Sequence, residues 1–164
     1  MHPYPLIRGG GLFLMLVGAG ITAGTLWPVA RRTLLASSFA LAALVTTLFA
    51  HRLARPLGHP TPLQLAALAG AVVAEVVLIG TVVHLFRGHG DRTVELAVMF
   101  VVGVHFLPMA VAFGPLVGLL SLLSVLNAAG GLWLARGTHL LVFWTADGIL
   151  KMTIGGMMFF VAPK

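Results

Sequence analysis

Six stretches of this chain, each about 20 residues long, contain almost no charged side chains, and this pattern constrains the fold most strongly. They cover residues 10–29, 33–50, 62–86, 94–113, 114–134 and 138–161. About 20 apolar residues in a helix cross the hydrocarbon core of a bilayer. None of the stretches alternates apolar and polar residues with the period of a strand. The sequence therefore predicts an all-α integral membrane protein, with six transmembrane helices in a single domain, residues 1–164.

Composition excludes the main alternatives to a membrane protein. Only 9% of the residues are charged, against about 25% in a soluble domain. There are 10 Lys and Arg against 4 Asp and Glu, but these basic residues lie singly or in pairs between the apolar stretches. They form no stripe for nucleic acid, so the expected partner is the lipid bilayer with its anionic headgroups. Cysteine is absent, which excludes disulfides and thiolate chemistry.

The first apolar stretch is interpreted as a retained helix. It is followed by Trp27-Pro28 and the arginines 31–32, and no small-residue cleavage site of a signal peptide is evident. The basic residues divide almost evenly between the two sides of a six-span protein, so they set no orientation in the membrane.

The two halves of the chain share a faint repeat. Residues 74–82 and 146–154 align at an alanine, the acid after it, a leucine three positions beyond the acid and a threonine six positions beyond it. Three spans in each half would form an inverted repeat with a site near the membrane midplane. The alternative is a chance similarity between helices rich in leucine, alanine and valine.

Small residues favour close helix packing. Gly20 and Gly24, like Gly114 and Gly118, are four positions apart, and residues 155–156 are both glycine. Small residues at this spacing allow two helices to approach closely. They predict a compact bundle or a homo-oligomer.

Ionisable groups inside the spans are the main functional signal, since each costs about 2.5–3.5 kcal/mol near a helix centre on insertion scales. Four lie there: Glu75, His105, Asp147 and Lys151. Asp147 precedes Lys151 by four positions, the favourable order for an intrahelical ion pair. Glu75 and His105 have no such neighbour. The short turn 87–93 makes their helices antiparallel neighbours, so the two side chains are expected to pair.

The net charge of these four groups depends on a single proton. Two acids and one lysine leave a single negative charge, which a proton on His105 or Glu75 neutralises, and such a site can couple to proton movement. Asn127, in the middle of the fifth span, is expected to line the same cavity or to join two helices. The structural alternatives are a packing pair for Asp147 and Lys151 and a hydrogen-bonded core residue for His105.

Other chemistry is weakly represented. His84, His89, Asp91 and Glu95 surround one turn, but their spacing matches no zinc template and a solvated turn explains them. The sequence lacks a phosphate-binding loop, a dinucleotide fingerprint, a serine elbow and an HExxH motif. We therefore expect no metal site and no catalytic residues, and disfavour an enzyme.

Three segments of the second half, VHFLP (104–108), LNAAG (126–130) and DGILK (147–151), occur together with Gly155. In these segments the chain resembles an uncharacterised bacterial family of small multi-spanning membrane proteins, over roughly residues 95–160. The resemblance implies a six-helix membrane fold with no assigned activity.

The Asp147-x-x-x-Lys151 pair also resembles the chromophore helix of microbial rhodopsins. There the lysine forms a Schiff base with retinal, and an aspartate one turn earlier is part of the counterion that this cation needs in a low dielectric. The resemblance implies retinal on Lys151 as the alternative to no cofactor. This chain departs from that family in having six predicted spans instead of seven, and a full extra span separates Pro108 from Lys151.

The sequence as a whole predicts a small multi-pass protein of the inner (plasma) membrane that acts as a proton-linked transporter or channel for an ion or small solute. The predicted ligand, ion or proton site comprises Glu75, His105, Asn127, Asp147 and Lys151. The alternatives are a binder of a lipophile or a retinal-type chromophore through Lys151, and a structural or regulatory membrane subunit.

Overall fold

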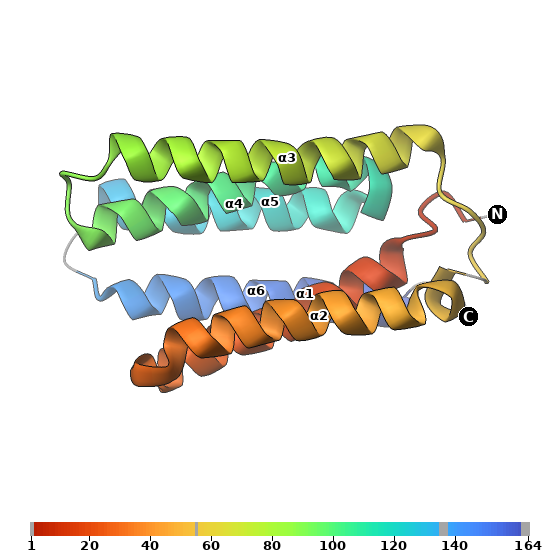
Figure 1. Ribbon diagram of the computed structural model, residues 1–164, viewed down its shortest axis with the longest axis horizontal. Coiled ribbons are helices and arrows are strands. Elements are labelled where there is room, and N and C mark those ends of the chain that lie inside the picture. Colours follow the sequence, from red (N-terminus) through yellow and green to blue (C-terminus); the bar gives the residue numbers. More distant parts are fainter. Residues whose placement is uncertain (1, 55, 135–137, 162–164) are drawn as a thin grey trace.

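The computed structural model of the chain describes residues 2–54, 56–134 and 138–161. Within these ranges six helices are long and apolar enough to cross a membrane, which confirms the predicted all-α fold (Figure 1). They are α1 (Ile7–Leu26), α2 (Arg31–Ala54), α3 (Pro62–Leu85), α4 (Asp91–Phe113), α5 (Pro115–Ala129) and α6 (Leu140–Val161). A 3₁₀ turn, η1 (Pro28–Ala30), precedes α2. A π-helical turn, η2 (Gly130–Leu134), extends α5, and the fifth membrane-spanning segment therefore runs over Pro115–Trp133.

The start of α3 is fixed by local chemistry. Thr61 Oγ1 accepts a hydrogen bond from the Gln64 backbone N–H at 3.3 Å, and Gln64 Oε1 accepts from the Thr61 N–H at 2.9 Å. This reciprocal capping box satisfies two backbone donors that a helix start leaves free. The Gln64 side-chain amide also donates to Pro3 O at 2.8 Å and to Val111 O at 3.4 Å. One end of the bundle is thereby tied together by a buried side chain.

The helices form an incomplete ring. α1 packs against α2 and α6, α4 packs against α3 and α5, and α5 packs against α6. Among the described residues, α2 and α3 each pack mainly along one neighbouring helix, so the ring is open between them (Figure 1). Their outer faces are apolar and exposed, as expected for helices in contact with lipid.

Glycines bring α1 and α6 into backbone contact. A Cβ atom on Gly18 would lie 2.6 Å from the carbonyl oxygen of Gly148, and one on Gly155 would lie 2.6 Å from that of Gly11. Only glycine permits so close an approach, the small-residue packing common between membrane helices. Gly155 was among the small residues that the sequence suggested for close packing, and Gly18 was not. Of the other suggested glycines, Gly20 and Gly24 face Ser38 and Arg31, respectively. A homo-oligomer stays a prediction, as does the inverted repeat.

Candidate functional site

The four ionisable residues inside the spans form two adjacent pairs near the middle of the helices. His105 Nδ1 on α4 lies 3.5 Å from Glu75 Oε1 on α3, the expected contact between these helices. On α6, the Lys151 ammonium donates to Asp147 Oδ2, one turn away. These contacts provide each charged group with a partner, which the membrane interior demands.

The Asp147–Lys151 pair is enclosed by protein. Its side chains are only 6% and 3% exposed, respectively. Ser124 Oγ on α5 donates to the other carboxylate oxygen of Asp147 at 3.1 Å. The Lys151 ammonium lies 5.4 Å from the centroid of the Phe106 ring, a cation–π distance. Lys151 therefore has an anion and an aromatic face as partners.

The Glu75–His105 pair is less enclosed. The Glu75 side chain is 22% exposed and that of His105 6%. His105 Nδ1 is 2.6 Å from Val102 O, and a carbonyl oxygen can only accept, so Nδ1 carries a hydrogen. The remaining ring nitrogen, Nε2, is the atom at which the imidazole gains or loses its proton.

Both pairs contribute to one cavity of about 630 Å³, here called the central cavity. Glu75, His105 and Lys151 are its ionisable lining residues among those described. The rest of its wall is mainly apolar and includes Phe13 of α1, Phe39 of α2, Val72 of α3 and Met109 of α4. α2 and α3 form opposite walls of the cavity, on the side where the ring of helices is open. Its volume lies within the range of about 300–1,000 Å³ typical of small-molecule sites.

A family model described as a family of unknown function, DUF6609, matches residues 2–164. The chain belongs to this family. The match covers all the described helices, whereas the sequence suggested a likeness over residues 95–160 only. No curated protein and no solved structure matches the chain. Membership in DUF6609 therefore assigns no function to the chain.

Asn127 has a structural position in this DUF6609 protein. Its side-chain amide donates to Phe143 O at 2.9 Å and so joins α5 to α6. It is absent from the lining of the central cavity. Of the two expectations for this residue, the interhelical hydrogen bond is the one the structure contains.

An ion pair at one end of the bundle was not predicted from the sequence, in which Glu95 is expected to be a solvated residue near a span end. Glu95 Oε2 accepts from Arg31 Nη2 at 2.5 Å and from Trp144 Nε1 at 2.8 Å. The Arg31 guanidinium lies 4.6 Å from the centroid of the Trp144 ring. The cluster links α2, α4 and α6. The alternating direction of the helices could have indicated this contact. In an up-and-down bundle the α1–α2 and α3–α4 turns lie on the same side, which brings Arg31 and Glu95 to the same end.

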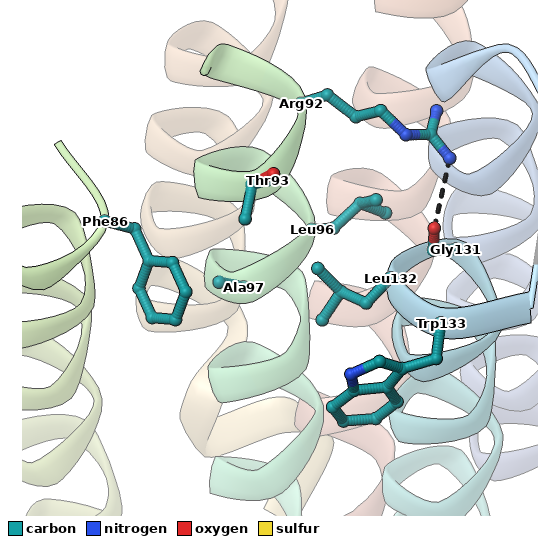
Figure 2. A pocket seen from close by; sticks show the side chains of 8 residues that line it. All are labelled: Phe86, Arg92, Thr93, Leu96, Ala97, Gly131, Leu132 and Trp133. Atoms are coloured by element: carbon teal, nitrogen blue, oxygen red, sulfur yellow. Dashed lines mark hydrogen bonds between the residues drawn. The ribbon is translucent and has the colours of Figure 1, made fainter. Parts of the chain in front are cut away.

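A second cavity of about 460 Å³ lies where α4 begins and η2 ends α5 (Figure 2). Leu96 and Trp133 supply apolar wall, and Arg92 reaches across to the backbone of Gly131. Arg92 donates to Gly131 O at 3.1 Å and to Thr138 O at 2.6 Å. The arginine thus satisfies the carbonyl oxygen of Gly131 in η2, the last turn of its helix, and links it to Thr138 before α6, which explains its position structurally.

The residues considered for a metal do not converge. Among the described residues, no group of three or more histidines and acids could hold a metal ion. The carboxylate of Glu95 binds Arg31 instead.

Proposed function

We propose that this membrane protein binds a lipophilic small molecule that enters the central cavity from the bilayer. The observation that carries the proposal is the combination of an apolar wall, an opening between α2 and α3, and three ionisable side chains at mid-membrane depth: Glu75, His105 and Lys151. Ligand sites typically pair apolar walls with a few polar groups that fix orientation.

The membrane position of the cavity selects the kind of ligand. A solute arriving through the α2–α3 opening must first dissolve in hydrocarbon, so its surface must be mostly apolar. Its polar group would meet Glu75 and His105, whose burial near the bilayer centre is costly without partners. The central cavity therefore favours a molecule that is apolar at one end and polar at the other.

The binding test uses two valines that are adjacent in α3. Val72 lines the central cavity, and Val73 does not. Tritiated triphenylmethanol, a neutral apolar probe, is equilibrated with detergent micelles that contain the protein or are empty. We expect saturable binding that Val72→Trp abolishes and Val73→Trp preserves. Equal retention in both folded variants contradicts a site in the central cavity.

Proton-linked transport is the second candidate function, favoured by the 3.5 Å contact between His105 and Glu75 at the cavity wall. A pair balanced on one proton is suited to coupling solute binding to proton movement. Proteoliposomes loaded with a pH dye test this function. We expect a proton flux that falls in Glu75→Gln and in His105→Ala, and an unchanged flux in both variants excludes these residues as the coupling site.

Retinal on Lys151 is the covalent form of the lipophile proposal, favoured by the position of Lys151 on the cavity wall. Its amine would condense with the aldehyde and release water, and Asp147 would serve as the counterion. Protein purified with added retinal should then absorb visible light, with the band bleached by hydroxylamine and missing in Lys151→Arg. A colourless product excludes this form.

A further inference from the structure

The charges around the central cavity are distributed unequally among the helices. Glu75 comes from α3, His105 from α4 and Lys151 from α6, whereas α1, α2 and α5 supply only uncharged lining residues. Asp147 is not part of the lining. A ligand in the cavity therefore meets one acid, one imidazole and one ammonium among the described residues.

The ammonium is already compensated. Lys151 donates to Asp147 and is 3% exposed, with the Phe106 ring also close to its charge. The pair is electrically neutral and its polar atoms are bonded. Lys151 therefore contributes little net charge to the cavity.

Glu75 and His105 determine the charge that remains. With one titratable proton, on the Glu75 carboxylate or on His105 Nε2, the pair is neutral, and without it the pair carries a single negative charge. His105 directs its Nδ1 hydrogen to Val102 O, and its side chain is more buried than that of Glu75. The carboxylate of Glu75 is therefore the group that a ligand can reach.

A single negative charge in an apolar cavity is costly, and either a proton or a cation from the ligand can remove that cost. A small metal ion would lose its hydration water on entering the cavity, and the wall offers few oxygen atoms to replace that water. An organic cation with apolar substituents keeps its charge next to the carboxylate and buries its substituents against the wall. The central cavity thus favours organic cations with apolar substituents over metal ions.

We infer that the ligand of the central cavity is a lipophilic cation, that Glu75 is its counterion, and that its entry displaces the one titratable proton that Glu75 or His105 Nε2 can hold. The inference rests on the proposed function, since it presumes that the central cavity binds ligands. The exchange balances: one O–H or N–H bond of the protonated pair breaks, its proton passes to solvent, and one cation takes its place, so the net charge in the cavity is unchanged.

The test compares probes of similar shape and opposite charge. Tetraphenylphosphonium and tetraphenylborate are equilibrated with the detergent-solubilised protein, alongside neutral triphenylmethanol. We expect saturable binding of the phosphonium and at least tenfold weaker binding of the borate. In weakly buffered solution, a pH indicator should record about one proton released per phosphonium bound, and affinity should fall by up to tenfold per unit of pH lowered.

Matched variants assign the effect to Glu75. Glu75→Gln should abolish both phosphonium selectivity and proton release, while Glu75→Asp, which keeps a carboxylate, should retain both. His84→Gln, on the same helix but outside the cavity lining, should behave as the wild type. If Glu75→Gln does not fold, charge selectivity and proton release in the wild type decide the question.

The outcomes separate the two proposals. Binding of triphenylmethanol with equal affinity for phosphonium and borate, or phosphonium binding without proton release, overturns the cation inference and leaves the cavity as a binding site. Failure of all three probes to bind the folded protein contradicts the proposed function itself.

Discussion

His105 Nδ1 lies 3.5 Å from Glu75 Oε1, and this contact joins α3 to α4 at the wall of the central cavity. α3 packs mainly against α4, so the contact helps to hold one side of the lateral opening. The same two side chains serve as the polar floor of the proposed binding site. The pair thus combines a contact between two helices with a place in the proposed binding site.

We predict a measurable energetic coupling between Glu75 and His105. Glu75→Gln, His105→Gln and the double variant form a double-mutant cycle for unfolding in detergent. Because the side chains are in contact and largely buried, we expect a coupling of about 0.5–3 kcal/mol. Thr81→Val, on α3 outside the cavity lining, combined with His105→Gln is the control. A coupling no larger than in that control excludes a stabilising contact.

We predict that Lys151→Met destabilises the protein strongly. It leaves the carboxylate of Asp147, a nearly buried group, without its cation, which costs about 3–5 kcal/mol in comparable buried pairs. Adding Asp147→Asn should recover most of the loss, because the amide is uncharged and still accepts from Ser124. The midpoint of thermal unfolding of the three proteins measures this.

The same double variant separates packing from function. If Asp147→Asn with Lys151→Met is stable and still binds or transports, the pair is neither essential to packing nor part of the site. A stable but inactive double variant assigns the pair a functional role. Strong destabilisation of the double variant indicates that the ion pair itself specifies the packing.

Much of the fold was predictable because the bilayer leaves a chain few solutions. Apolar runs of spanning length must be helices, since every backbone polar group needs an internal partner. Two site contacts were predictable for local reasons: four positions separate Asp147 from Lys151, and one short turn places Glu75 opposite His105.

The parts of the fold and of the site that were not predicted depend on which helices are neighbours in space. The ion pair of Arg31 with Glu95 joins α2 to α4 across 64 positions of sequence, and the order of helices around the bundle is not encoded in hydropathy. The central cavity exists because α2 and α3, although consecutive, do not close the ring. Hydropathy gives two similar spans there and does not indicate the space between them.

We predict that the α1–α6 contact tolerates no side chain at Gly148. A Cβ atom there would lie 2.5 Å from Thr22 Oγ1 and 2.9 Å from Gly18 O, so Gly148→Ala must push the helices apart. Overpacking of this kind costs about 1–3 kcal/mol. Gly156→Ala on the same helix is the matched control, because a Cβ atom there meets nothing within 4 Å. Equal thermal stability of the two variants contradicts the close contact.

We predict that the cluster of Arg31, Glu95 and Trp144 stabilises the position of α2. Arg31→Gln removes both the ion pair with Glu95 and the cation–π contact with Trp144. The Arg31 and Glu95 side chains are 20% and 34% exposed, so solvent weakens the pair and we expect a loss of about 1 kcal/mol. Arg32→Gln, at the exposed neighbouring position, should change stability by less than half as much.

Because α2 forms one wall of the central cavity, Arg31→Gln should also weaken probe binding more than Arg32→Gln does. If it lowers stability but leaves affinity unchanged, the cluster anchors the helix without shaping the cavity.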